Sequence, residues 1–570
     1  MAAPPIIRPW RMPLLPAAIG LAAAWLTLTP SLLPRTALFQ GVLCAAAALL
    51  GYGAGAFVGW IGRGVGVVPG AAVRRRAWQV FAVVAVLGSA VMLWLSHDWQ
   101  RRQRAEIGME PVPAWQLAIA VAAVAVVFAL LLVISRAVRG AGRWLILRID
   151  RFLPRAVAVV LGALLVAWGS YALVRGVAVG RVAEALDASF LVTNDEFLDD
   201  VAPPTVAELS AGPGSAVSWA ELGRQGRVFI ANAPTAAQIA EFVDEGGSAA
   251  AGSGADAERP ALQPIRVYVG GGTEGELDLQ EQAATAVQEL ERTGAFDRAV
   301  LNVVTGTGRG WVNENQARAL EFMWGGDTAT VSMQYSYLPS WMSYLVDSQR
   351  AREAGRELFE AVYARWDALP EGERPLLVAS GESLGSYGSE GAFGSAQDLA
   401  ARTDGALYVG PTANNVLWAQ FTAARNPDSP IHLPVYDGGE TVRFSADGAD
   451  WPGDGAWAAP RVGYLQQAND PVTWLDFDIA LSPPEWLRGE RGPGVPDAMV
   501  WVPVVTALQL AVDQLASGVP DGQGHEFGQA PAYAWASILP PEGWSRADTE
   551  RLAERLAELR ILDIDTASSS

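Results

Sequence analysis

A serine flanked by glycines lies in the second half of the chain, in the sequence Gly381-Glu382-Ser383-Leu384-Gly385. A short apolar run, 376–379, precedes this sequence, and a helix-compatible segment follows it. A strand that ends in a tight, glycine-flanked turn before a helix lifts the serine hydroxyl clear of the sheet edge. The pattern therefore predicts that Ser383 is a nucleophile. The alternative is an ordinary Gly/Ser turn in a glycine-rich chain.

A serine nucleophile requires a base to take its proton and an acid to orient that base. Outside the apolar N-terminal third the chain has two histidines, His432 and His525. We predict that His525 is the base, because it lies in a glycine-rich loop after the amphipathic stretch 504–515. His432 lies between prolines in an extended segment and is interpreted as a structural or surface residue. Asp470 directly follows an apolar run and precedes a proline, which makes it the candidate acid; the alternative is a turn aspartate.

The oxyanion of an acyl-transfer intermediate needs two backbone N–H donors. We expect the first to be the amide of Leu384, directly after the nucleophile. The second is expected from the glycine-rich loop 305–311, at Thr307 or Gly308. A dinucleotide-binding loop is the alternative for that segment, but the acidic residue that this fingerprint requires after the next strand is missing. The chain contains no lysine, which excludes a phosphate-binding P-loop.

Aromatic side chains follow the predicted strand 328–335, and Tyr335, Tyr337 and Trp341 are predicted to line an acyl pocket. The alternative is that they belong to the core at the strand end. No metal site is expected, because one cysteine and three widely separated histidines give no zinc-ligand spacing. The sequence likewise predicts no cofactor.

Five apolar runs crowd into the first third of the chain, each near the roughly 20 residues that a membrane-spanning helix needs. Arginines between the runs number twelve on one side against six on the other, which predicts a cytoplasmic N-terminus and an extracytoplasmic domain after about residue 178. The net charge of −19 belongs to the remaining two thirds and argues against nucleic-acid binding. The five predicted spans are 14–33, 37–61, 77–95, 115–135 and 156–173.

The rest of the chain divides at a Gly/Ala/Ser tract, 246–257, which is too polar and small to bury much surface. From residue 264 short apolar runs alternate with amphipathic segments, which predicts an α/β domain with a mostly parallel sheet covered on both faces. Before the tract, 227–231 is a possible strand. The expected domains are a five-span transmembrane bundle (1–178), a connector (179–262) and a catalytic α/β domain (263–570).

These residues together resemble a known family, the bacterial α/β-hydrolases whose catalytic domain follows an N-terminal transmembrane bundle. The chain order Ser383, Asp470, His525 is that of the α/β-hydrolase fold. By resemblance, these residues take the nucleophile, acid and base positions. The loop after Thr305 departs from the family pattern at Gly306 and Arg309. The segments that carry the resemblance are 28–35, 223–227, 333–341, 381–385, 435–439, 470–472 and 524–525.

The sequence as a whole predicts a membrane-anchored, esterase-like serine hydrolase that acts on a lipid or other amphiphilic ester outside the cytoplasmic membrane. Two alternatives stay open. The same triad would serve an acyltransferase with an alcohol acceptor, and a non-catalytic membrane scaffold would use the outer domain only to bind a partner.

Overall fold

A computed structural model describes residues 13–66, 70–151, 201–246, 260–271, 278–338 and 340–562, with a few single positions between 154 and 198. The chain divides into two compact units. Unit 1 comprises Met1–Ala183 and Leu475–Pro520, and unit 2 comprises Glu184–Trp474 and Asp521–Ser570. Residues 475–520, expected in the catalytic domain, thus cluster with the N-terminal segment. The expected connector falls largely in unit 2.

Unit 2 is built on a seven-stranded sheet in which every described pair of neighbours is parallel. The strand order is β1-β3-β2-β4-β5-β7-β6. Nearly every strand residue is buried, as expected for a parallel sheet with both faces covered. The strands are β1 (Ile265–Val269), β2 (Val300–Thr305), β3 (Thr328–Met333), β4 (Leu376–Glu382), β5 (Gly405–Val409), β6 (Val442–Ser445) and β7 (Arg461–Leu465).

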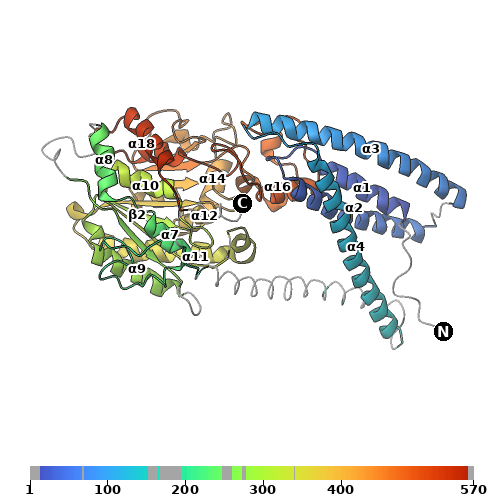
Figure 1. Ribbon diagram of the computed structural model, residues 1–570, viewed down its shortest axis with the longest axis horizontal. Helices are drawn as coiled ribbons and strands as arrows, with labels where there is room; N and C mark the ends of the chain where they lie inside the picture. Colours follow the sequence, from blue (N-terminus) through green and yellow to red (C-terminus); the bar gives the residue numbers. More distant parts are fainter. Residues whose placement is uncertain are drawn as a thin grey trace. The chain divides into compact units, whose positions relative to one another are not determined.

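Helices cover both faces of this sheet (Figure 1). On one face lie α9 (Leu279–Thr293), α11 (Ser340–Asp367) and α12 (Leu384–Ser389). The other face is covered by α8 (Ala236–Gly246), α10 (Glu314–Met323), α17 (Ala530–Ile538) and α18 (Arg546–Glu558), whose apolar side chains form one core with Val378, Leu407 and Leu465. The predicted α/β architecture with a parallel sheet is confirmed.

Two local features differ from the sequence prediction. The edge strand β6 was not predicted, because four residues carry too little periodic signal to stand out. The possible strand 227–231 is wrong: these residues end helix α7 (Gly223–Ala231). Buried residues at Val228, Phe229 and Ile230 imitate a strand pattern, but the helix also buries Arg227, which donates to the carbonyls of Asn194 and Glu196.

Unit 1 contains, within the described residues, three helices long and apolar enough to cross a membrane. They are α2 (Ala37–Gly64), α3 (Ala71–Glu106) and α4 (Gln116–Ile149). The first predicted span is instead α1 (Leu14–Leu26), whose 13 residues are too few for a full crossing. It ends there because Pro30 and Pro34 prevent the helix from continuing. The fifth predicted span, 156–173, lies almost entirely outside the described residues.

The segment Leu475–Pro520 of unit 1, here termed the insert, contains a 3₁₀ turn, η7 (Phe477–Ala480), and helix α16 (Val505–Asp513). Helix α16 packs against both η7 and α2. The insert follows the candidate acid Asp470 and precedes the candidate base His525 along the chain. It therefore separates the two residues in sequence while belonging to the other compact unit.

Candidate active site

Ser383 lies in a strained turn between strand β4 and helix α12. Its backbone has φ 52° and ψ −124°, a conformation that residues with a side chain rarely adopt. A Cβ on Gly385 would lie 2.2 Å from the carbonyl oxygen of Thr305, and one on Gly381 would lie 2.5 Å from that of Gly385. Both flanking glycines are therefore required sterically, and the turn has the geometry expected of a nucleophile elbow.

Asp470 and His525, 55 residues apart in sequence, are in direct contact. Nδ1 of His525 lies 2.7 Å from Oδ2 of Asp470, whose side chain is fully buried. The other oxygen of Asp470 accepts a hydrogen bond from the amide of Val472 at 2.8 Å. One carboxylate oxygen therefore orders the turn that begins α15 (Pro471–Trp474), and the other orients the imidazole.

The loop that carries His525 is also held by two amide side chains, which the sequence analysis did not identify. Asn469, buried beside Asp470, accepts a hydrogen bond from the amide of Gly524 at 2.9 Å. Gln467 donates to the carbonyl of Glu526 at 3.0 Å. These bonds hold the residues on both sides of the imidazole. Asparagine and glutamine are common near turns, so the sequence alone offered no signal to single them out.

The end of strand β5 brings the imidazole close to the serine turn. The amide of Ser383 donates to the carbonyl of Val409 at 2.9 Å. The next residue, Gly410, has φ 52°, and a Cβ there would lie 2.4 Å from Cε1 of His525. Nε2 of His525 is buried without a hydrogen-bond partner among the described residues, so its hydrogen bond to Ser383 is not formed. Such catalytic bonds often tighten only when substrate is bound.

A further carboxylate, Glu382, precedes the serine directly. It accepts a hydrogen bond from the side chain of Asn313, and burial raises its pKa to about 7 against the opposing effect of His525. Burial by itself lowers the pKa of His525, but Asp470, with smaller effects of Glu382 and Glu526, more than offsets burial and raises that pKa to about 9. The imidazole therefore lies in an acidic environment that favours its protonated form.

Comparison with known protein families gives two matches. Residues 265–552 match the model of a family described as the alpha/beta-hydrolase family. The chain belongs to this α/β-hydrolase family. A second model, described as the N-terminus of the alpha/beta-hydrolase family, matches residues 28–234. Comparisons with curated proteins and with solved structures give no significant match.

In this α/β-hydrolase the candidate oxyanion donors differ in how their amides are engaged. Leu384 begins α12, where the first N–H groups of a helix have no acceptor within the helix. The amide of Thr307, in contrast, donates to the carbonyl of Trp311 at 2.8 Å. That bond closes the loop on itself and engages the amide of Thr307, and the second oxyanion donor, at Thr307 or Gly308, stays a prediction.

The aromatic residues predicted to line an acyl pocket of the α/β-hydrolase are mostly buried at the end of β3. Tyr335 is fully buried, and the hydroxyl of Tyr337 donates to the carbonyl of Gly271 at 2.9 Å. The side chain of Trp341, at the start of α11, lies outside the described ones. Burial of this kind fits the core alternative, and the pocket role stays a prediction.

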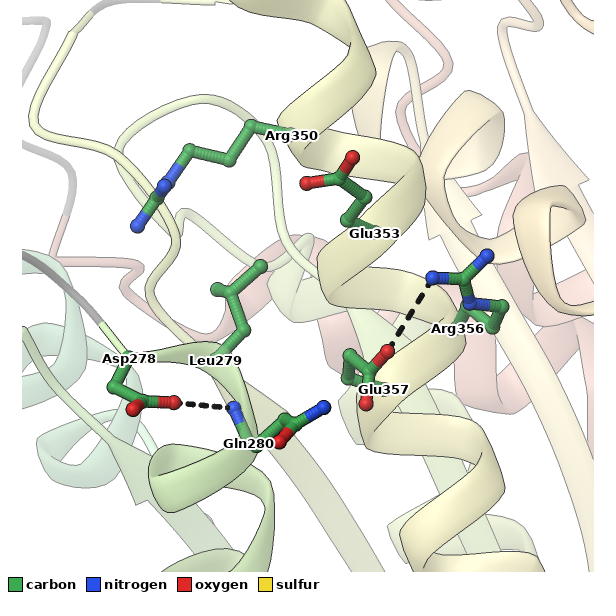
Figure 2. Close-up of a pocket in the computed structure, with 7 residues that line it drawn as sticks. All are labelled: Asp278, Leu279, Gln280, Arg350, Glu353, Arg356 and Glu357. Carbon is green, nitrogen blue, oxygen red and sulfur yellow. Dashed lines mark hydrogen bonds and ion pairs between the residues drawn. The ribbon is translucent and has the colours of Figure 1, made fainter.

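A surface hollow of about 480 Å³ lies elsewhere on the domain, between the start of α9 and helix α11 (Figure 2). Asp278 accepts from the amide of Gln280 there, and Arg356 pairs with Glu357. None of the three candidate catalytic residues lines it. Within the described part of the chain, no group of three or more histidine, cysteine or acidic side chains is placed to hold a metal ion.

Proposed function

We propose that this protein is a membrane-anchored serine hydrolase that cleaves an ester of a lipid or other amphiphile. The observation that carries the proposal is the 2.7 Å contact between His525 and Asp470, beside a glycine-flanked serine in a strained strand-to-helix turn. Membership in an α/β-hydrolase family supports hydrolytic chemistry. Ester specificity is proposed because an acyl-enzyme on serine is readily formed from an ester.

In the proposed reaction, Nε2 of His525 takes the hydroxyl proton of Ser383 while the serine oxygen attacks the ester carbonyl carbon. The carbonyl oxygen becomes an oxyanion, for which the amide of Leu384 is the first proposed donor and an amide of the loop 305–311 the second. Collapse of this intermediate breaks the bond to the alkoxy oxygen, which leaves as an alcohol with the proton from His525. Water, deprotonated by the same imidazole, then attacks the acyl-enzyme and releases the acid and the free serine.

Membrane anchorage is supported by the three long apolar helices of unit 1. Many apolar side chains of α3 and α4 are exposed, as is expected of helices that contact lipid; Val86 of α3 is 69% exposed and Val126 of α4 is 68% exposed. The expectation of a cytoplasmic N-terminus and an extracytoplasmic catalytic domain rests on five crossings, the first of which α1 is too short to make. The side of the membrane on which the catalytic domain lies therefore stays a prediction.

Labelling with a fluorophosphonate probe tests the nucleophile. The wild-type chain is expected to form a covalent adduct that peptide mass spectrometry maps to Ser383, because the oxygen of a base-activated serine displaces fluoride from the probe and forms a phosphonate ester. Ser383→Ala should abolish the adduct while circular dichroism and thermal unfolding stay close to wild type. Ser482→Ala, at an exposed serine outside the turn, is the control and should keep the adduct. A wild-type protein without any adduct would instead support the scaffold alternative.

The charges around His525 predict an unusual pH dependence. The base must be neutral, and its pKa is raised to about 9, so kcat/KM for a short soluble ester should still be rising above pH 7. Glu382→Gln removes a carboxylate that favours the imidazolium ion, so the rising limb should move to lower pH. Because Glu382 and His525 interact, the pKa read from the rising limb belongs to the pair and not to either residue alone.

The control for this measurement is Glu390→Gln. Glu390 is also buried with its pKa raised to about 7, but its partners are Asn415, Tyr464 and the backbone at Leu417. That substitution should leave the midpoint of the rising limb in place, whatever it does to the maximal rate. A limb that does not move in Glu382→Gln would rule out its influence on the base.

A further inference from the structure

The insert is attached to the N-terminal helices by a buried polar cluster. Nε of Arg35 lies 2.6 Å from Oδ1 of Asp513, and the two side chains are 1% and 0% exposed. The hydroxyl of Ser31 donates to the other oxygen of Asp513, and Gln509 donates to the carbonyl of Thr29 at 3.0 Å. Residues 28–35, one of the segments that carry the family resemblance, thus bind the insert through its helix α16.

This cluster lies at one end of a candidate membrane span. Arg35 comes two residues before α2, which has 28 residues and is therefore about 42 Å long at 1.5 Å per residue. That length exceeds the roughly 30 Å of a hydrocarbon core, so the ends of α2 reach the headgroup level. The insert, bound at the start of α2, therefore belongs at the level where lipid meets water.

The insert exposes large apolar side chains. Phe477 is 77% exposed, Leu481 is 80% exposed and Val504 is 42% exposed. They lie together, because the amide of Val504 donates to the carbonyl of Ala480 at 2.9 Å and Phe477 lies four residues before Leu481. We refer to these three residues as the apolar patch. An exposed apolar cluster of this kind marks a surface that binds a membrane or another protein.

The backbone at Val504 is strained. Its φ is 65°, which a β-branched residue very rarely adopts, and the amide of Val505 donates to the carbonyl of Pro503 at 2.7 Å across it. A valine held in this γ-turn is strained, which costs energy. Val504 is held in this turn with its side chain 42% exposed.

The charges beside the patch limit what it binds. Asp476 and Asp478 flank Phe477 and are exposed, so an anionic surface would be repelled. Uncharged acyl chains and zwitterionic headgroups remain compatible with the patch. The same compact unit also carries the lipid-facing sides of α3 and α4, so a bilayer around those helices is close to the level of the insert.

We infer that the apolar patch, Phe477, Leu481 and Val504, inserts into the acyl-chain boundary of the bilayer in which the N-terminal helices lie, and gives the enzyme access to lipid esters there. The inference rests on the proposed membrane anchorage and deepens the proposed function, because it assigns a bilayer-borne ester as the substrate class. The insert is continuous in sequence with the turn of Asp470 on one side and the loop of His525 on the other.

Site-directed quenching in the full-length protein tests the depth of the patch. Cys44 is the only cysteine, so a Cys44→Ala background allows single labels at Phe477→Cys or Leu481→Cys. Each labelled protein is reconstituted into phosphatidylcholine nanodiscs and exposed to acyl-chain spin-labelled phosphatidylcholine or to iodide. Glu490→Cys, an exposed polar position of the same insert, is the matched control. Labels in the patch should be quenched by the lipid and protected from iodide, and the control label should behave in the opposite way.

Kinetics provide the second readout. The double variant Phe477→Ser/Leu481→Ser should raise the apparent KM for an ester carried in phosphatidylcholine vesicles by about 10- to 100-fold for each lost side chain. Its kcat/KM for a short soluble ester should be unchanged, since neither residue touches the candidate triad. Serine substitutions at exposed positions are not expected to prevent folding.

The outcomes separate the two proposals. Iodide quenching of patch labels equal to that of the Glu490→Cys label overturns the inference, and so does protection from both quenchers, which would indicate a covering protein surface. Failure of the chain to co-purify with nanodiscs contradicts the anchorage and the inference with it. Absence of a fluorophosphonate adduct on Ser383 rejects the hydrolase proposal alone, and the quenching result still decides the position of the patch.

Discussion

Asp470→Asn is expected to lower kcat for a short soluble ester by about 10⁴-fold, an effect of the size seen when the orienting carboxylate of a serine triad is lost. The 2.7 Å contact of Oδ2 with Nδ1 of His525 holds the imidazole with Nε2 available to Ser383. An asparagine either donates to Nδ1 or offers a weaker acceptor, so the tautomer and the stabilisation of the imidazolium ion are lost. Asparagine is nearly the same size as aspartate, and its oxygen retains the bond from the amide of Val472.

The same variant should also change the pH profile. Removing the carboxylate that most strongly raises the pKa of His525 should shift the rising limb of kcat/KM to lower pH, while the maximal value falls. Measurement of kcat and kcat/KM from pH 5 to about 10 checks both effects. The exposed Glu440→Gln is a control for charge removal and should match wild type. A loss of less than tenfold in Asp470→Asn would reject Asp470 as the orienting acid.

Asp513→Ala is expected to weaken the attachment of the insert by about 3 to 5 kcal/mol, because it leaves Arg35 buried without its partner. The hydroxyl of Ser31 and the amide of Leu33 lose an acceptor at the same time. Hydrogen exchange of the amides of α16 should therefore accelerate by roughly 10²- to 10⁴-fold in the full-length protein. The exposed Asp497→Ala is the matched control and should change exchange very little.

A double variant separates the ion pair from the packing around it. Arg35→Met/Asp513→Leu removes both charges and supplies apolar side chains of similar volume, so it should recover much of the stability that Asp513→Ala loses. If the double variant is as unstable as Asp513→Ala, the hydrogen bonds to Ser31 and Leu33 rather than the ion pair hold the insert. If the amides of α16 exchange in Asp513→Ala at the wild-type rate, the buried cluster does not attach the insert.

The insert connects these two predictions. It begins at Leu475, five residues after Asp470, and ends at Pro520, five residues before His525. Loss of its attachment in Asp513→Ala is therefore expected to affect turnover of a bilayer-borne ester more than that of a soluble one. The buried Asp470–His525 contact and the bonds from Asn469 and Gln467 hold the catalytic loops independently of the insert.

Much of the catalytic domain was predictable because its signals are local. The period of apolar residues located β1 to β5 and β7, and the glycines around Ser383 predicted the turn, since only glycine tolerates the close approach of Thr305 and Gly385. The order of serine, aspartate and histidine along the chain predicted the pairing of Asp470 with His525. Family membership agrees with the expected fold, and the catalytic roles stay proposals.

The number of membrane spans was less predictable from hydropathy. The run 14–33 is mostly apolar, but the residues from Thr27 to Arg35 are not part of helix α1, and Ser31 and Arg35 bind Asp513 of the insert. Apolar composition indicates that a segment can be buried, but it does not indicate whether lipid or protein buries it. Only the partners of the segment distinguish the two.

The sequence by itself determined the parallel α/β sheet, the nucleophile turn and the family, because periodicity, steric demand and short motifs are properties of neighbouring residues. The tertiary structure alone decided that Leu475–Pro520 clusters with the N-terminal helices, that the amide of Thr307 is engaged within its loop, and that Gly410 lies against His525. These are contacts between residues far apart along the chain or the closing of a loop on itself. Their energy depends on where folding places both partners, which no single segment specifies.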